Sequence, residues 1–280
     1  MKIISLLNEK GGSSKTTVAT TIASGLAVRG QRVLLIDADP QGHGTIMLGL
    51  EKEPCIYDLL VRDALWSKTL RQVSDDQFTP RGQKPLGTLV ALPSNVETRN
   101  IANSISDSGL LRYRLDELQD VIDVVIIDTS PTPSLFHGSI YLAADAVIYP
   151  TQAEYLSVDG LIESLKHLDK ANVTRLNERG LEALKIAGIQ PTMVDPKTVT
   201  HSEYLKLLTH EFKRLVWPPL PSRIVWADAS AARQSIFRYV DEDVDPDSID
   251  AGYQRSKGEA GSALREAWAL VKRVERVLNG

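Results

Sequence analysis

Short runs of apolar residues alternate with longer segments of mixed polarity along most of this chain. The runs are rich in Val, Ile and Leu without strict alternation, which is typical of strands that are buried on both faces. We therefore predict strands at 2–7, 31–39, 87–93, 123–131, 145–151 and 185–195.

The segments between the apolar runs show helical periodicity. The helices that we predict most clearly cover 15–30, 109–120, 157–170 and 201–215. Strands that alternate with helices indicate a parallel sheet covered on both faces. The sequence therefore predicts an α/β fold, a doubly wound and mostly parallel sheet flanked by helices, in one domain over 1–280. Ligands of such folds bind at the carboxyl ends of the strands.

Two polar segments interrupt this pattern. Residues 74–85 are rich in turn formers, and residues 241–250 contain six carboxylates. The acidic spacing does not match a calcium-binding EF-hand loop. We expect both segments to be loops, the second one a solvated acidic loop.

Composition narrows the classes of protein that remain. The net charge of −4 excludes a globally basic nucleic-acid binder, although a local basic face remains possible. Cys55 is the one cysteine, so a disulfide framework and a cysteine-only metal cluster within one chain are excluded, and we expect a small, half-buried side chain there. The apolar runs are too short for a signal peptide or a membrane span, which predicts a cytoplasmic protein.

The segment "NEKGGSSKTT" (8–17) lies between the first predicted strand and the first predicted helix. It departs twice from the common phosphate-binding pattern G-x-x-x-x-G-K-[ST], because Glu9 replaces the first glycine and Ser14 the second. Glycines let backbone N–H groups approach an anion, and the helix N-terminus adds its positive dipole end. Lys15 would reach the β- and γ-phosphates, and the Thr16 hydroxyl would ligate Mg²⁺. The predicted phosphate cradle consists of Gly11, Gly12, Ser13, Ser14, Lys15, Thr16 and Thr17.

Carboxylates end two of the predicted strands. Asp37 and Asp39 follow "VLLI", and Asp128 follows "DVVII". In a parallel sheet these ends gather beside the phosphate loop, where carboxylates hold Mg²⁺ or orient an attacking water. Simple capping of turns is the alternative, but it does not explain three such features in register. The predicted metal ligands are Thr16, Asp39 and Asp128.

Four stretches, "NEKGGSSKTT", "VLLIDADPQGHGT", "DVVIIDTSPTPS" and "PTQAEYLSVDGL", resemble in order and spacing the ParA/Soj partition ATPases of the deviant Walker A class of P-loop NTPases. The resemblance is close over 1–165 and looser over 185–280. It implies an ATPase with weak intrinsic activity that uses ATP and Mg²⁺. Because the loop starts at residue 8, it implies the short form without an N-terminal DNA-binding extension.

The resemblance also assigns roles to single residues. Lys10 is similar to the signature lysine of this class, which reaches across a two-fold axis to the partner's ATP and implies an ATP-dependent homodimer. Lys10, Lys15 and Asp39 would be catalytic, Asp128 would be the Walker B acid near Mg²⁺, and Pro221 would lie near the base. The chain departs from the family at Ser14 (usually glycine), at His43 (often asparagine) and at "TSP" (129–131). We expect the Ser14 side chain to affect hydrolysis more than binding.

Beyond the nucleotide, the resemblance implies binding to duplex DNA without sequence preference, a nucleoid-associated location, and a ParB-like or other cargo-adaptor partner that stimulates hydrolysis. Residues 201–280 contain twelve basic and twelve acidic residues, and six of the acids fall within 241–250. The remainder of this segment is therefore basic. The candidate DNA contacts are Arg223, Arg233 and Arg238.

Two other functions remain open. The C-terminal segment has an apolar stripe, which could bind a membrane as in the related MinD, but such a stripe is also normal for a helix docked on a sheet. We favour the docked helix and expect no stable membrane association. A metabolic P-loop enzyme such as dethiobiotin synthetase is the second alternative, but it would not need Lys10 or the "ADPQ" stretch. A nitrogenase iron protein is excluded, because each subunit would need two cysteines and this chain has one. The stripe consists of Leu264, Trp268, Val271, Val274 and Leu278.

Overall fold

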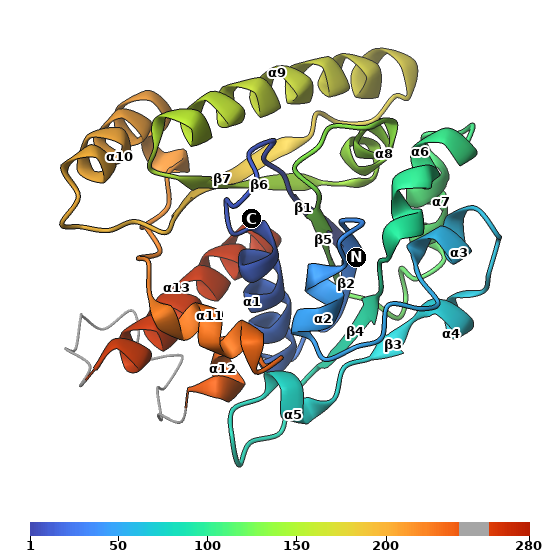
Figure 1. Ribbon diagram of the computed structural model, residues 1–280. Helices are drawn as coiled ribbons and strands as arrows, with labels where there is room; N and C mark the ends of the chain where they lie inside the picture. Colours follow the sequence, from blue (N-terminus) through green and yellow to red (C-terminus); the bar gives the residue numbers. More distant parts are fainter. Residues whose placement is uncertain (241–257) are drawn as a thin grey trace.

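The computed structural model describes residues 1–240 and 258–280, so the predicted acidic loop at 241–250 lies outside the described residues. Seven strands form one sheet in the order β3-β4-β2-β5-β1-β6-β7 (Figure 1). All described pairings are parallel except that of the short edge strand β3, which the apolar pattern did not predict. The strands are β1 (Lys2–Leu6), β2 (Arg32–Ala38), β3 (Arg71–Gln72), β4 (Thr88–Leu92), β5 (Val124–Thr129), β6 (Ala146–Gln152) and β7 (Lys185–Thr192).

Helices cover both faces of this sheet, which confirms the predicted doubly wound fold. On one face α1, α12 and α13 pack against the sheet, and on the other face α3, α7, α8 and α9 do so. The helices are α1 (Lys15–Val28), α2 (His43–Met47), α3 (Ile56–Leu60), α4 (Trp66–Thr69), α5 (Asp75–Phe78), α6 (Ile101–Ser104), α7 (Leu110–Asp116), α8 (Leu135–Ala143), α9 (Tyr155–Glu178), α10 (Val199–Phe212), α11 (Ile224–Ala231), α12 (Ile236–Tyr239) and α13 (Glu259–Asn279), with 3₁₀ turns η1 (Val96–Asn100) and η2 (Lys213–Leu215).

Side-chain alternation along the strands divides the core into two layers. In β2, Val33 and Leu35 face the α1 layer, whereas Leu34 and Ile36 face the α7–α9 layer. A strand whose successive side chains are all buried requires cover on both sides. This is the physical reason why the unbroken apolar runs predicted the architecture correctly.

The C-terminal helix α13 docks on α1, as the sequence led us to favour. The predicted stripe faces inward: Leu264, Trp268, Val271 and Val274 are buried, and Leu278 packs at the margin of the same cluster. The Trp268 ring lies 4.1 Å from the Phe237 ring, centroid to centroid. The apolar face of α13 therefore belongs to the core. No helix within the described ranges is long and apolar enough to cross a bilayer.

Two expectations about local structure need correction. Residues 75–78, inside the segment predicted to be a loop, form the one-turn helix α5, because the fully buried Phe78 anchors them to the core. The Ser235 hydroxyl donates to the Phe78 carbonyl at 2.9 Å and strengthens this anchor. Cys55 is fully buried rather than half-buried, and burial raises the pKa of its thiol to about 11. Cys55 is therefore a packing residue.

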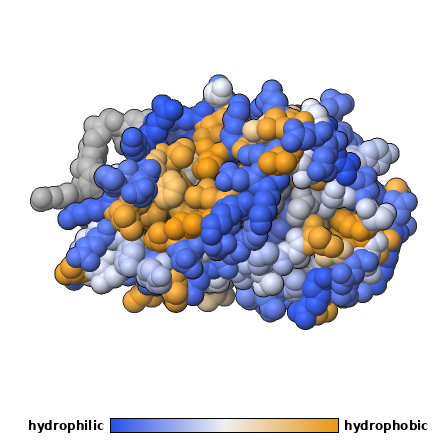
Figure 2. Space-filling model, turned by 90° about the horizontal axis from the view of Figure 1, so that it is seen from above, coloured by the Kyte–Doolittle hydropathy of each residue, from blue (hydrophilic) through white to orange (hydrophobic). Residues whose placement is uncertain are grey.

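Helix α9 runs well beyond the predicted 157–170 and spans 24 residues along one side of the molecule. Its outward side keeps several apolar side chains exposed, including Ile162, Val173 and Leu176. Figure 2, which looks down on this side, shows apolar residues gathered in patches between hydrophilic ones. Apolar atoms contribute much of any protein's solvent-exposed surface. The inward side of the same helix contacts the phosphate loop.

Candidate functional site

The phosphate loop joins β1 to α1 at the carboxyl edge of the sheet, as predicted. Strand β1 lies between β5 and β6, so its loop opens at the centre of the sheet. Two loop residues adopt left-handed backbone conformations, Gly12 with φ of 80° and Ser14 with φ of 62°. A residue with a Cβ is strained there by about 1 kcal/mol. The structure thus gives a backbone reason for the glycine that the common pattern has at the position of Ser14.

Lys15 is held under the loop before any nucleotide arrives. Its ammonium donates to the carbonyl of Asn8 at 2.9 Å and to that of Lys10 at 3.3 Å. Burial lowers the pKa of this ammonium, and the negative charges of Asp128 and Asp39 act in the opposite direction. The loop carbonyls and carboxylates therefore keep a positive charge where phosphate oxygens would bind.

Lys10 shows a different arrangement from Lys15. Its backbone N–H donates to the Asn8 Oδ1 at 2.9 Å, and its carbonyl accepts from Lys15. The Asn8 amide in turn donates to the Pro150 carbonyl at 2.8 Å, which ties the turn to β6. The Lys10 ammonium makes no ion pair or hydrogen bond with the residues that the structure describes. The backbone of Lys10 is thus fixed while its charge remains free.

Two carboxylates meet below the loop. Asp37 and Asp128 are opposite each other in the register of β2 and β5, and both are buried. The Asp37 Oδ2 accepts from the N–H and the hydroxyl of Thr45, both at 2.8 Å, and its Oδ1 accepts from the Asp39 N–H. Within the described ranges, neither Asp128 oxygen has a hydrogen-bond partner at normal distance. A buried and unsatisfied carboxylate is costly, which indicates a cation or donor absent from the protein itself.

The protonation of this pair follows from its surroundings. Burial raises the pKa of Asp128 to about 8, and the adjacent Asp37 charge adds to the rise, while the Thr16 hydroxyl and the Lys15 ammonium oppose it weakly. Burial likewise raises the pKa of Asp37 to about 6, although its Thr45 hydrogen bonds favour the charged form. The apo site therefore binds protons that a metal ion would displace.

The predicted metal ligands fit Mg²⁺. Asp128 offers two oxygens without partners among the described residues, Thr16 lies in the first turn of α1, and Thr16 and Asp39 line one cavity. In the part of the chain that the structure describes, no group of three or more His, Cys, Asp or Glu residues could hold a metal alone. Mg²⁺ keeps several waters and takes phosphate oxygens as ligands, so this sparse donor set matches a metal that arrives with a nucleotide.

A cavity of about 680 Å³ opens above the phosphate loop. Arg99 lines it from η1, and no motif in the sequence pointed to this residue. The segment before Arg99 is tied to the loop after β2, because the Ser94 hydroxyl donates to the Asp39 carbonyl at 2.6 Å. No local signal marks Arg99, since η1 is brought to the site by β4. The other lining residues are Gly11–Thr16, Asp39, Pro40, Gln41, His43 and Thr129–Thr132.

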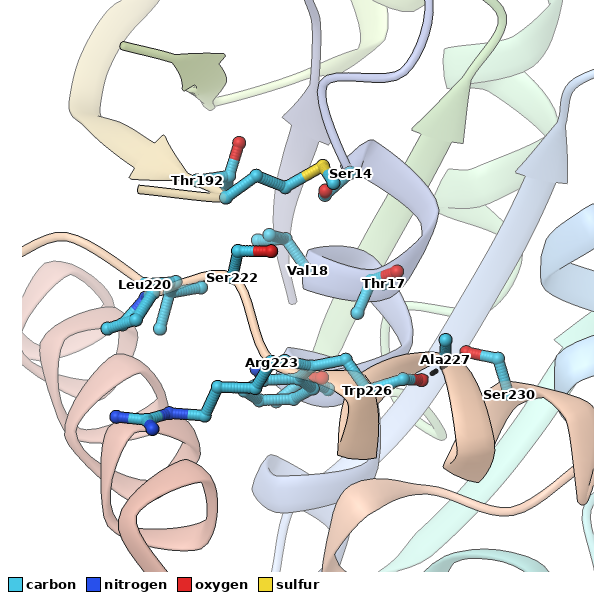
Figure 3. Close-up of a pocket in the computed structure, with 13 residues that line it drawn as sticks. Ser14, Thr17, Val18, Thr192, Leu220, Ser222, Arg223, Trp226, Ala227 and Ser230 are labelled. Atoms are coloured by element: carbon cyan, nitrogen blue, oxygen red, sulfur yellow. Dashed lines mark hydrogen bonds between the residues drawn. The ribbon is translucent and has the colours of Figure 1, made fainter. Parts of the chain in front are cut away.

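A second, smaller pocket of about 190 Å³ adjoins the N-terminal turns of α1 (Figure 3). Pro221 lines it, as expected for a residue near the base, and a parallel bridge between Val194 and Pro221 holds it at the end of β7. Trp226 on α11 forms another wall, which sequence reasoning missed. Ser14 borders both cavities, so the two adjoin at the start of α1. The remaining wall consists of Thr17, Val18, Thr21, Thr192, Met193, Leu220, Ser222, Arg223, Ala227 and Ser230.

The three candidate DNA contacts lie in different surroundings. Arg223 forms two hydrogen bonds with Glu266 on α13, the shorter one of 2.7 Å, and in Figure 3 its side chain extends toward that helix. Arg238 forms an ion pair of 3.0 Å with Asp76. Arg233 is exposed, at a left-handed position with φ of 55°. Sequence reasoning treated these cations as equivalent, but two of them already have acidic partners.

Comparison with known proteins shows which family this chain is similar to. A family model described as an AAA domain matches residues 1–180. The sporulation initiation inhibitor protein Soj of Bacillus subtilis is 30% identical over 247 residues, which are 85% of this chain and 91% of the relative. The chromosome-partitioning ATPase Soj of Thermus thermophilus is also 30% identical, over 94% of this chain and 97% of that protein.

Among solved structures, that of Cyanothece McdA(D38A) in complex with ATP superimposes with a TM-score of 0.75. The match covers 98% of this chain and 96% of that one, with 19% identical residues. At this low identity the likeness concerns the fold. It extends over almost the whole chain, including the looser last third.

Proposed function

This chain belongs to the family of ParA and Soj partition ATPases, and we propose that it moves or positions a cargo as an ATP-sandwich homodimer that binds duplex DNA. A cargo-adaptor protein of the ParB kind stimulates its slow ATP hydrolysis and releases it. The observation that carries the proposal is the contrast between the two lysines of the loop.

The nucleotide is ATP with Mg²⁺. The larger cavity accepts the triphosphate, because loop N–H groups, the start of α1 and the ammonium of Lys15 converge on it. The smaller pocket accepts the adenine between Pro221 and the partly buried Trp226. Because Ser14 borders both cavities, one nucleotide spans them across the first turn of α1.

Thr16, Asp39 and Asp128 would hold Mg²⁺, which would supply positive charge to neutralise the phosphates. Lys15 neutralises the same oxygens from below. Asp39 orients the attacking water, and its carbonyl is fixed by Ser94. Arg99 lines the same cavity and would add positive charge as negative charge develops. The loop after Asp128 borders the cavity and responds to the terminal phosphate.

Lys10 acts on the partner's nucleotide. Its backbone is fixed at the N–H and at the carbonyl, while its ammonium has no partner among the described residues. A lysine that bound the nucleotide of its own subunit would be expected to contact the loop through its ammonium, as Lys15 does. A free charge beside the mouth of the cavity instead fits a role across a two-fold interface, where it offsets phosphate charge that one subunit leaves uncompensated.

DNA binding by the dimer rests on family membership and on the basic excess of residues 201–280 outside the acidic segment 241–250. Arg233 is the leading contact because it is exposed. Arg238 contributes when its ion pair with the exposed Asp76 opens, and Arg223 when it leaves Glu266. The dimer presents two such faces, so ATP controls DNA affinity through avidity. This activity places the protein at the nucleoid.

The buried stripe of α13 gives no support to membrane binding through that helix. The free Lys10 likewise gives no support to a monomeric metabolic enzyme. Partition or positioning is therefore the function that the site supports best.

Light scattering after size exclusion tests the dimer. We expect a monomer with ADP and a dimer with ATP when Asp39→Ala blocks hydrolysis. Lys10→Ala should remain monomeric with ATP while it still binds the nucleotide. A Lys10→Ala protein that dimerises as well as its parent would contradict the sandwich arrangement.

A filter-binding or anisotropy experiment tests the DNA contacts. Arg233→Glu should weaken binding to all duplex sequences alike, and the log–log salt slope should fall by about 0.9 for each lost phosphate contact. Lys68→Glu, an exposed change on α4, is the control of equal charge. Sequence-selective binding that survives high salt, or equal loss in both variants, would contradict this interface.

A further inference from the structure

We propose that helix α9 sets the position of the trans-acting Lys10 through Gly160, Ser164 and His167, and that Glu9 is the residue through which it does so. The inference rests on the proposed function, because it concerns how Lys10 reaches the partner's nucleotide. It also explains why a glutamate stands where the common loop pattern has glycine. The three α9 residues are positioning residues, since none of them touches the cavity that accepts the phosphates.

The three residues lie on one face of α9, because positions i, i+4 and i+7 of a helix share a side. At the first position Gly160 lies against the loop turn. A Cβ added there would be 3.1 Å from the Lys10 Cβ, 3.2 Å from the Asn8 Oδ1 and 3.3 Å from the Lys10 nitrogen. These distances are tighter than ordinary contacts, so a side chain at this position would push Lys10 outward.

The second position holds the backbone of Glu9. The Ser164 hydroxyl accepts from the Glu9 N–H at 3.1 Å and donates to the Gly160 carbonyl at 2.8 Å. Ser164 is almost fully buried, so solvent does not compete for these bonds. One hydroxyl therefore joins the residue before Lys10 to the helix turn that Lys10 packs against.

At the third position, His167 contacts the side chain of Glu9. The His167 Nδ1 contacts the Glu9 carboxylate, and both side chains are partly buried, with 37% and 24% of their surface exposed. Glu9 is thus attached to α9 at its N–H and at its carboxylate. A glycine in place of Glu9 would keep only the first attachment.

This arrangement explains how Lys10 combines a fixed backbone with a free ammonium. Ordering a flexible segment at an interface costs free energy on association, and a segment that is already ordered avoids much of this cost. The α9 contacts order residues 8–10 in the monomer. The proposal therefore predicts an effect on dimerisation without an equal effect on nucleotide binding by the monomer, which depends on Lys15 and Thr16.

The test compares His167→Ala with Lys166→Ala, an exposed neighbour on the same helix, in the Asp39→Ala background with ATP. We expect His167→Ala to weaken dimerisation about fivefold, because residues 8–10 must then be ordered on association, and Lys166→Ala to leave it unchanged. Gly160→Ala, which moves Lys10 directly, should have the larger effect. ATP affinity of the dilute monomer should stay within twofold in all three variants.

A conservative variant separates positioning from general stability. His167→Gln keeps a donor toward Glu9 and should restore most of the lost dimerisation. The proposal is overturned if His167→Ala and Gly160→Ala dimerise like their parent, if monomer affinity for ATP falls by the same factor as dimerisation, or if His167→Gln is as weak as His167→Ala. If the Asp39→Ala parent itself does not dimerise with ATP, or dimerises without needing Lys10, the proposed function fails together with this inference.

Discussion

The two cavities that we propose as the phosphate side and the base side of the nucleotide site are built in opposite ways. The phosphate side consists of the loop after β1, charged side chains and two buried carboxylates. The carboxylates lie on β2 and β5, and the strands β2, β5 and β1 are adjacent in the sheet. The base side consists of a pocket with largely apolar walls, to which α1, the end of β7, the segment around Pro221 and α11 each contribute. The first side stores electrostatic free energy in the apo protein, whereas the second stores almost none.

The two sides differ in how much they lower the stability of the ligand-free protein. Asp128 is buried without a hydrogen-bond partner in the described structure, and Ser14 has a left-handed backbone, so the phosphate side is strained before ligand arrives. Sites that bind charged groups tolerate such strain because the ligand relieves it. The base side shows no comparable cost. We therefore expect substitutions on the phosphate side to act on chemistry and stability together, and those on the base side to act on affinity alone.

Lys15→Ala should have the largest effect on binding. It removes a charge-assisted contact to the phosphates and leaves the base pocket intact, so ATP affinity should fall by about 100-fold or more. Titration calorimetry measures the loss. Lys15→Ala protein that binds ATP like the unmodified protein would show that the phosphate side does not carry the affinity.

Asp128→Asn tests the stored electrostatic strain. The pKa of a carboxyl raised from 3.8 to about 8 in the folded state means that the folded protein binds more protons than the unfolded one between about pH 4 and 8. Stability of the apo protein should therefore fall as pH rises through this window, by up to about 1.4 kcal/mol per pH unit for one group. Asp128→Asn should reduce the slope and stabilise the apo protein at pH 8. Denaturant unfolding at several pH values measures both effects.

Two controls belong to this experiment. Mg²⁺ with ATP should also reduce the slope in the unmodified protein, because the cation replaces the proton. Asp37→Asn should remove only part of the slope, since Asp37 contributes through its own raised pKa of about 6 and the contribution of Asp128 remains. An unchanged slope in Asp128→Asn would show that this carboxylate is not strained.

Trp226→Ala tests the base side. Loss of one aromatic wall should weaken ATP binding by about tenfold, as for a base that stacks on a ring, and should leave the pH dependence of stability unchanged. Trp226→Phe keeps an aromatic wall and is the matched control. Trp226→Ala should bind ATP no more tightly than inorganic triphosphate, whereas Trp226→Phe should bind ATP as tightly as the unmodified protein. Together these results would show that the lost affinity comes from the base. If ATP affinity does not change in Trp226→Ala, the base binds elsewhere.

Ser14→Gly should have the smallest effect, and it should stabilise the protein rather than weaken it. Glycine adopts φ of 62° without the Cβ penalty, which should raise the free energy of unfolding of the apo protein by about 1 kcal/mol. The larger entropy of glycine in the unfolded chain should offset part of this gain. The melting temperature should rise by about 2 °C. Ser13→Gly, at a neighbouring position without positive φ, should lower it. Turnover of Ser14→Gly should also rise if the serine Cβ crowds the phosphates, and an unchanged rate would leave only the backbone effect.

The residues of the phosphate side are easier to predict from the sequence than those of the base side, for a physical reason. The loop, Lys15, Thr16, Asp39 and Asp128 were predicted as site residues because they lie next to strand ends, which are visible as the ends of apolar runs, and the structure brings them to one edge of the sheet. Pro221 was found only through family resemblance. Trp226 and Arg99 were missed, because nothing near either residue in the chain indicates that it borders a cavity formed by other elements.

The sequence alone determined the layered sheet, the place of the phosphate loop and the approach of Asp37 to Asp128. Each depends on local pattern plus the rule that parallel strands end on one edge. The tertiary structure decided which charges are free. It placed Arg223 on Glu266 and Arg238 on Asp76, it buried Lys15, and it fixed the backbone of Lys10 on Asn8 and α9 while leaving its ammonium unpaired among the described residues. Partners of a charge come from distant segments, and their distance in space is set only when the whole chain is packed.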